Sequence, residues 1–166
     1  MWGICTNRIS SALLIALFGV IALSAIGAGA VVINEVELNA PGNATKWVEL
    51  YNDGEDDVDL GGWVVNIVNL PWKGPIAIPE GTVIPANGYY IAEGEEQWSQ
   101  DYNGTVILMD AAGIKVDETH NMADESDSDF TSGRYPNGLD TDQKSDWKLM
   151  KATPGAENAL SMKVLY

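Results

Sequence analysis

The clearest pattern in the chain is a series of short apolar or alternating runs that starts at Val31 and is broken repeatedly by glycine, asparagine and all seven prolines. Such punctuation favours strands over helices. Seven strands are predicted, near Val31–Leu38, Lys46–Asn52, Val58–Asn69, Pro75–Ile78, Tyr89–Ala92, Thr105–Met109 and Ile114–Glu118. Seven short strands of this kind are typical of a β-sandwich.

The alternation is clearest in the second of these strands. Val48 and Leu50 fall on one face of it, while Trp47, Glu49 and Tyr51 fall on the other, because successive side chains of a strand point to opposite faces. One face of this strand is therefore expected to lie in the core.

Turn residues stand between the runs, at Asn52-Asp53-Gly54, Asn87-Gly88 and Ala112-Gly113. The stretch from Thr119 to Ser132 is polar and acidic, which predicts a solvated loop. No segment after Ala30 shows an amphipathic helical stripe. The sequence therefore predicts an all-β fold.

Residues 1–30 stand apart from this pattern. Arg8 is followed by an uncharged, mostly apolar run from Ile9 to Ala30 that ends in Ala28-Gly29-Ala30, which predicts a signal peptide cleaved after Ala30. An uncleaved membrane anchor is the alternative, because 22 helical residues would reach across a hydrocarbon core of about 30 Å. The single cysteine, Cys5, precedes the apolar run, so the predicted exported part has no disulfide.

All 24 acidic residues follow Ala30, together with eight of the nine lysines and arginines, so residues 31–166 carry a net charge of −16. The basic residues are scattered singly between Lys46 and Lys163. Binding to a phosphate backbone requires clustered basic side chains that release counterions. Nucleic acid is therefore not expected as a partner.

Several local motifs appear in a fixed order along the chain: Ile33-Asn34-Glu35-Val36, residues 47–52 (WVELYN), residues 58–65 (VDLGGWVV), residues 84–91 (IPANGYYI), residues 132–138 (SGRYPNG), Asp140-Thr141-Asp142, Asp146-Trp147 and residues 153–158 (TPGAEN). In this order and over residues 32–158, the chain resembles the lamin tail domain family, of the type exported by microbes.

The resemblance implies an immunoglobulin-like β-sandwich over residues 31–158, used for binding or scaffolding and without a catalytic site. The chain lacks the coiled-coil rod of true lamins, and its acidic charge does not fit a nucleic-acid-binding tail, so nuclear functions are not transferred. Residues 159–166 extend past the last motif as a C-terminal tail. Met162, Val164 and Tyr166 alternate there as in an added edge strand.

Five of the six tryptophans follow Ala30 and offer candidate core or binding groups. Trp47, Trp63 and Trp147 lie inside the motifs and are expected to fill or border the core. Trp72 and Trp98 lie in turn-rich, polar surroundings, where an exposed ring would stack on a sugar or anchor a protein partner. The alternative is that both rings cover the end of the sandwich.

Two sets of residues are candidates for catalysis or zinc binding. Glu35 and Glu49 resemble a glycosidase acid pair but lie within predicted strands, so catalysis is not expected. His120 is the only histidine and is expected in a solvated loop, which excludes histidine-rich zinc sites. No cofactor is expected.

Two groups of aspartates offer oxygen ligands for calcium. One group is Asp140, Asp142 and Asp146, and the other is Asp124, Asp127 and Asp129. Neither group fits an EF-hand loop, and the alternative is that these side chains cap turns and keep the protein soluble.

Asn43 and Asn103 begin N-glycosylation sequons. They would be modified only in an organism that glycosylates its exported proteins.

The leading functional hypothesis is a non-catalytic module of the cell exterior that contacts a protein or an envelope polymer through loops or a strand edge. A calcium-dependent adhesion or matrix module is the second hypothesis, and an extracellular hydrolase is the third.

Overall fold

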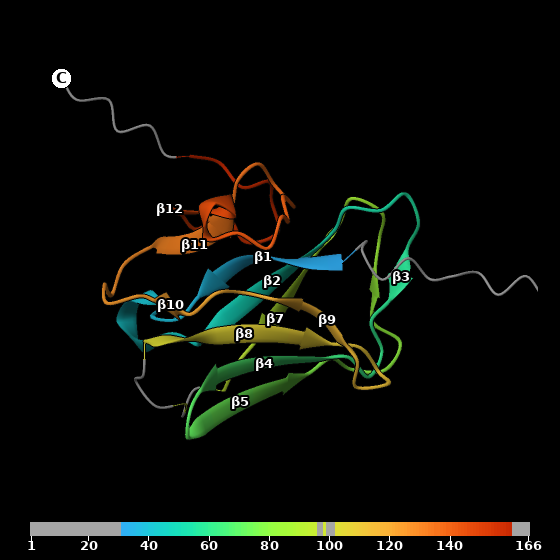
Figure 1. Cartoon of the computed structure of the whole chain (residues 1–166), viewed down its shortest axis with the longest axis horizontal. Coiled ribbons are helices and arrows are strands. Elements are labelled where there is room, and N and C mark those ends of the chain that lie inside the picture. The colour runs from blue at the N-terminus through green and yellow to red at the C-terminus, as the bar shows by residue number, and fades with distance from the viewer. Residues whose placement is uncertain (1–30, 96–97, 99–101, 161–166) are drawn as a thin grey trace, which may run out of the picture.

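Alternating buried and exposed side chains form two antiparallel sheets that face each other across one core (Figure 1). The computed structural model describes residues 31–95, 98 and 102–160. The first sheet has the order β12-β11-β1-β2-β7. Its strands are β1 (Val31–Glu37), β2 (Trp47–Asn52), β7 (Tyr89–Glu93), β11 (Phe130–Arg134) and β12 (Trp147–Lys151).

The second sheet has the order β10-β8-β4-β5, and β9 also pairs with β8. Its strands are β4 (Val64–Asn69), β5 (Trp72–Ala77), β8 (Asn103–Met109), β9 (Lys115–Glu118) and β10 (Met122–Ala123). Two short strands, β3 (Val58–Asp59) and β6 (Val83–Ile84), pair at one end of the sandwich (Figure 1). Two short 3-10 helices cover Pro41–Asn43 and Lys144–Asp146. The all-β, immunoglobulin-like prediction is confirmed.

The core lies between the sheets and is built from alternate residues of the central strands. The first sheet contributes Ile33, Val36, Val48 and Leu50, and the second contributes Val65, Ile67, Val106 and Leu108. The predicted core positions Val48 and Leu50 are confirmed. Leu60, Ile78, Ile84 and Met122 close the ends of this core.

Strand β1 is buried along its whole length, on both faces. Its register against β2 shifts between Ile33 and Glu35, so Asn34 is the extra residue of a β-bulge. One face of β1 packs on the core through Ile33 and Val36. The other face carries Glu35, which lies directly opposite Glu49 of β2. Two carboxyl groups are therefore neighbours in a buried position.

The C-terminal part of the chain covers this polar face. Thr153 and Gly155 donate backbone hydrogen bonds to Glu35 and Glu49, and the Asn158 amide donates to the Asn34 carbonyl oxygen. The loop after β11 adds a hydrogen bond from the Gly138 backbone to the Asn34 side chain. Figure 1 shows these orange and red segments beside β1. The polar face of the first sheet is thus covered by protein.

The sequence located most strands but missed four. The predicted strand Val58–Asn69 is divided into β3 and β4 by a turn in which Gly62 has a φ of 76°. Strands β6, β10, β11 and β12 were not predicted, and the region expected to be a solvated loop from Thr119 to Ser132 contains β10 and the start of β11. Strand β11 has the sequence FTSGR, which lacks alternating apolar residues because it buries polar groups.

Arg134 at the end of β11 joins the two sheets. Its side chain is 1% exposed and forms an ion pair of 3.0 Å with Asp117 of β9 and one of 2.7 Å with Asp140. Arg134 also donates to the carbonyl oxygens of Ile33 and Leu139. Asp117 in turn accepts the Ile33 backbone N–H at 2.7 Å. Every strong donor of the guanidinium thus has a partner at the edge of the core.

Replacing Arg134 with methionine should destabilise the protein by about 3 to 5 kcal/mol, because Asp117 would remain buried without its counter-charge. Arg134→Lys should recover little of the loss, since an ammonium group lacks the planar fork that contacts four acceptors. Chemical denaturation would measure both variants. Lys151→Met, which removes an exposed ion pair of 3.3 Å, is the matched control and should change stability by less than about 1 kcal/mol. A similar loss in the control would contradict this role of Arg134.

Candidate functional site

The Glu35 and Glu49 carboxylates, which resemble a catalytic pair in the sequence, are both saturated with structural hydrogen bonds. Glu35 accepts from the Thr131 hydroxyl and from the backbone N–H and hydroxyl of Thr153. Glu49 accepts from the Asn34 amide at 2.9 Å and from the Gly155 backbone at 2.7 Å. Both are inaccessible to solvent. These bonds hold the C-terminal segment against β1 and β2, and no substrate can reach the two carboxylates.

Burial raises the pKa of Glu49 to about 7, although hydrogen bonds from Asn34 and Gly155 oppose the shift. A raised carboxyl pKa in an open cleft would indicate a general acid. Here the same shift follows from burial beneath the C-terminal segment. It reflects a cost of folding and does not by itself indicate chemistry.

A second pair of carboxyl groups joins the end of β1 to the loop after β10. Burial, to which the neighbouring charge of Asp124 adds, raises the pKa of Glu37 to about 8. The Asn39 backbone donates to Glu37 at 2.7 Å, while Asp124 Oδ2 is buried without a hydrogen-bond partner among the described atoms. Glu37 therefore favours its neutral, protonated form near pH 7.

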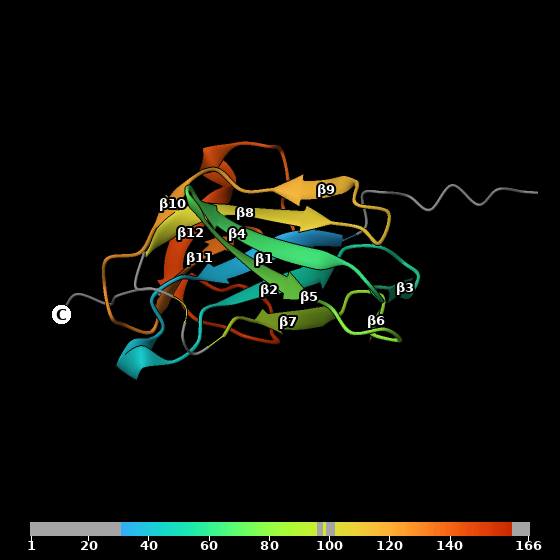
Figure 2. The same ribbon diagram turned by 90° about the horizontal axis from the view of Figure 1, so that it is seen from below.

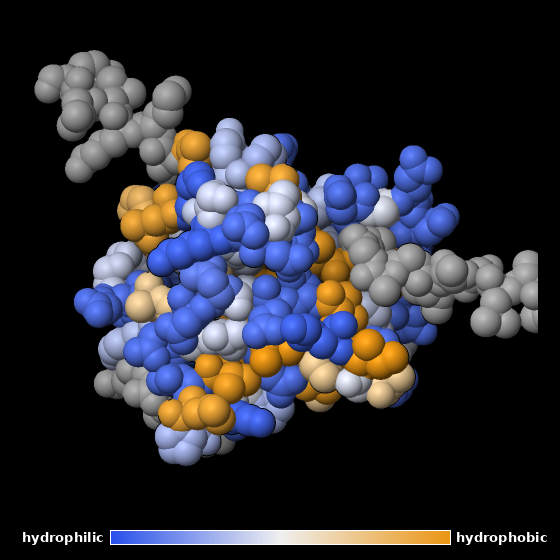
Figure 3. Space-filling view, viewed as in Figure 1, coloured by the Kyte–Doolittle hydropathy of each residue, from blue (hydrophilic) through white to orange (hydrophobic). Residues whose placement is uncertain are grey.

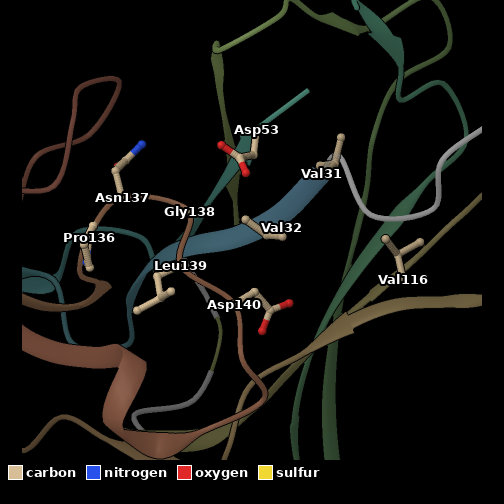
Figure 4. A pocket seen from close by; sticks show the side chains of 9 residues that line it. All are labelled: Val31, Val32, Asp53, Val116, Pro136, Asn137, Gly138, Leu139 and Asp140. Carbon is tan, nitrogen blue, oxygen red and sulfur yellow. The ribbon is translucent and has the colours of Figure 1, made fainter. Parts of the chain in front are cut away.

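An open hollow with a volume of about 550 Å³ lies where β1 begins (Figure 4). Its walls come from β1, β9 and the loop after β11. It is lined by Val31, Val32, Asp53, Val116, Pro136, Asn137, Gly138, Leu139 and Asp140. Residues far apart in the sequence meet here because β1 lies between β2 and β11 in the first sheet and β9 approaches from the second.

The hollow combines an apolar wall with carboxylates. Figure 4 shows Val31, Val32 and Val116 on one side and the Asp53 and Asp140 carboxylates nearby. Asp140 is held by Arg134, but no described residue forms a hydrogen bond or ion pair with the exposed Asp53 carboxylate. An apolar surface beside a free carboxylate can hold a ligand but provides no proton-transfer pair.

Asn137 fixes the loop that forms one side of this hollow. Its side-chain oxygen accepts from Asn34 and from the Asn158 backbone, and its amide donates to the Tyr89 hydroxyl at 3.2 Å. Gly138 has a φ of 70°, and an added Cβ would lie 2.8 Å from the Tyr51 ring. Only glycine fits at this position. The loop that forms this side of the hollow is therefore held in one conformation.

The tryptophans Trp72 and Trp98 are brought together, with ring centroids 5.4 Å apart in an edge-to-face arrangement. Both are half-buried and pack against the core, and Gly74 and Gly94 leave the space that the rings occupy. This geometry agrees with the alternative that the two rings cover the end of the sandwich. Trp63 and Trp147 also pack against the core, whereas Trp47 is half-buried on β2.

The first group of candidate calcium ligands is engaged in the protein itself. Asp140 is paired with Arg134, and Asp146 accepts from Thr141 and from the Gln143 backbone. Burial would raise the pKa of Asp146, but these hydrogen bonds and the charge of Arg134 lower it. Asp142 is exposed. The group therefore organises the loop that leads into β12.

The second group is spread along the loop before β11. Asp124 accepts from Ser126, Asp127 accepts the Gly42 backbone N–H at 2.9 Å, and Asp129 pairs with Lys151. In the described part of the chain, no three His, Cys, Asp or Glu side chains are arranged to hold a metal ion.

His120 differs from the expected solvated residue. It is half-buried, with its ring 6.2 Å from that of Trp147 and its Nδ1 atom buried without a partner among the described residues. Burial lowers its pKa, and the charges of Lys144 and Arg134 add to this effect. A smaller hollow of about 250 Å³ lies beside it.

The remaining sequence predictions fall on exposed or undescribed positions. Asn103 begins β8 and is exposed, and Asn43 ends the first 3-10 helix. Residues 1–30, predicted as a signal peptide or anchor, and residues 161–166 of the tail lie outside the described residues. Within residues 31–160, as far as they are described, no helix is long and apolar enough to span a bilayer.

The polar residues that position the hollow could not be predicted from the sequence pattern. Asn34, Arg134, Asn137 and Asn158 form one hydrogen-bonded group, yet no spacing rule connects positions more than a hundred residues apart. Their presence in the ordered motifs was the one available signal.

The raised pKa of Glu37 makes stability depend on pH. Because the folded-state pKa of about 8 exceeds the usual 4.5, this stabilisation is complete below pH 4.5 and is lost as the pH rises through 8. The melting temperature should therefore fall between pH 5 and pH 9. Glu37→Gln, which imitates the protonated acid, should flatten this fall and raise stability at pH 9 by on the order of 3 kcal/mol. Glu125→Gln, at an exposed position, is the control, and an equal effect there would contradict the assignment.

Calcium should leave the melting temperature unchanged to within about 1 °C, because the aspartates that could bind it are already held by Arg134, Thr141, Gly42 and Lys151. Thermal unfolding in EDTA and then in millimolar calcium would test this, with magnesium as the control for ionic strength. A calcium-specific rise of several degrees would restore the adhesion-module hypothesis.

The model of the Lamin Tail Domain family matches residues 24–122. No curated protein matches the chain. The family match ends within β10, whereas β11, β12 and the residues up to Asn158 complete the first sheet and its cover. Because the match covers more than half of the chain and agrees with the immunoglobulin-like sandwich described above, the protein belongs to the lamin tail domain family.

Proposed function

We propose that this protein is an exported, non-catalytic binding module that contacts a protein or an envelope polymer of the cell exterior through the hollow at the start of β1. The observation that carries the proposal is the combination of an apolar wall and the unpaired Asp53 carboxylate in an open hollow of about 550 Å³. Rigid elements that present a few adaptable polar groups are typical of binding sites.

The buried polar groups support a non-catalytic role. A hydrolase requires an acid and a base that reach the substrate. The strongly shifted carboxyl groups Glu37 and Glu49 are instead covered by protein and bonded to backbone groups. The exposed Asp53 carboxylate, with which no described residue forms a hydrogen bond or ion pair, lies in the hollow, where it is suited to recognition.

Export is supported by the sequence. The apolar run before Val31 ends in small residues, and the 16 net negative charges that follow it favour solubility outside the cell. The hollow is lined by Val31 and Val32, so it lies next to the expected cleavage point. Cleavage after Ala30 would leave the new N-terminus at the edge of this site.

Co-sedimentation of the full-length chain with washed envelopes of its source cells tests the proposal. The bound chain is expected to have the mass of residues 31–166, and Asp53→Lys should weaken binding at least roughly tenfold, as is common for a central contact. Glu125→Lys makes the same charge change at an exposed position away from the hollow and should bind normally. Absence of binding, or an equal loss in both variants, would contradict the proposal.

A further inference from the structure

The outward face of the second sheet carries several apolar residues at positions where an antiparallel sheet exposed to water normally carries polar ones. Core residues of β4 and β8 alternate with residues that point outward. The outward positions of β4, β5 and β8 are Val64, Asn66, Val68, Lys73, Pro75, Ala77, Thr105, Ile107 and Met109. We call these nine residues the outer face; Lys115 and Glu118 of β9, which form an exposed ion pair, border it opposite Met109 and Ile107.

Strands β4, β5 and β8 contain no aspartate or glutamate, although the chain carries 24 acidic residues. Strand β8 contains an unbroken apolar run from Val106 to Met109. Such runs are typical of strands that are covered on both sides. Here Val106 and Leu108 are buried, while Ile107 and Met109 remain partly exposed. The sequence of β8 is therefore typical of a strand covered on both faces, although in the single chain only its inner face is covered.

The two sheets differ in what covers them. The outer side of the first sheet is polar and lies beneath the C-terminal segment. Figure 2 looks toward β4, β5 and β8, and no described segment crosses in front of them. In Figure 3, hydrophobic side chains also reach the surface in the region of β4, β5 and β8, within a largely hydrophilic side of the molecule. The outer side of the second sheet is thus the less polar of the two, and it is the one that no described segment covers.

We propose that the outer face binds the same face of a second copy of this chain, so that the protein forms a symmetric dimer by sheet-to-sheet packing. Two copies that each carry 16 net negative charges repel one another at most orientations. Contact through the outer face brings together strands β4, β5 and β8, which contain no acidic residue. Apolar surface is then buried where the electrostatic repulsion between the two copies is weakest. This inference does not depend on the proposed function.

Charge at the edges of the sheet fits a two-fold axis parallel to the strands. Such an axis places β5 of one copy over β9 of the other, because these strands lie at opposite edges of the sheet. Lys73 of β5 then approaches Glu118 of the partner subunit. Lys73 is level with Thr105 of β8, and Glu118 is level with Ile107. The two positions are therefore offset by two residues, about 7 Å along a strand, which both long side chains can bridge.

The size of the outer face predicts a weak dimer. Four strands spaced about 4.8 Å apart and about six residues long give a footprint of about 19 by 20 Å. Standard interfaces bury about 800 Å² of accessible surface per partner, so this footprint is roughly half the standard size and fits a transient contact. A weak, reversible dimer is therefore expected. Added salt should strengthen the dimer by screening the net repulsion.

Sedimentation equilibrium of the intact, full-length chain in mild detergent tests the proposal. Ile107→Glu should raise the dimer dissociation constant at least roughly tenfold, because it places an acid at the centre of the contact in both copies. Asn66→Asp, a change of almost no volume at a neighbouring outward position, should act in the same direction and guards against misfolding of the first variant. Melting temperatures of both variants verify that they fold.

Leu149→Glu is the matched control, because Leu149 is also a large apolar residue, 69% exposed, but lies on β12 of the other sheet. It should leave the dimer unchanged. A chain that stays monomeric up to about 1 mM would overturn the proposal and assign the outer face to a different partner. A dimer that resists Ile107→Glu and Asn66→Asp, or that Leu149→Glu weakens equally, would also overturn it.

Discussion

The burial of β1 on both faces is the constraint on which the rest of the structure depends. One face of the strand contributes to the apolar core, but the bulge at Asn34 and the carboxyl group of Glu35 place polar groups on the other face, where solvent does not reach them. A buried polar group without a partner costs about 1 to 3 kcal/mol. The chain must therefore bring other segments to this face, and it does so with residues from Thr131 to Asn158.

This requirement explains why the fold extends beyond the span matched by the family. The residues from Phe130 onward add β11 and β12 to the first sheet, deliver Arg134 to Asp117, and place Thr153, Gly155 and Asn158 over β1. Without them Glu35 and Glu49 would be neighbouring carboxylates with few donors. The same bonds build the loop that lines the hollow, so the binding site and the stability of the first sheet share one set of residues.

The two sheets satisfy their outer faces in opposite ways. The first sheet buries a polar face under its own chain and accepts carboxyl groups with raised pKa values, Glu37 and Glu49, as the cost. The second sheet leaves an apolar face uncovered by the described residues. In an acidic protein a largely apolar face, bordered by the single carboxylate of Glu118, is the surface best suited to a contact between copies, while the hollow with Asp53 is suited to a different partner.

The sequence by itself determined the all-β class, most of the strands, the core positions Val48 and Leu50 and the family, because alternation and turn chemistry are local properties and the motifs kept their order. It did not reveal β11 and β12, the burial of Glu49 and Tyr51 on the second face of β2, or the engagement of Asp140 by Arg134. These features depend on residues up to 124 positions apart meeting in space. Only the tertiary structure decided that Glu35 and Glu49 are structural, because whether a carboxylate is free or bonded is set by what packs over it.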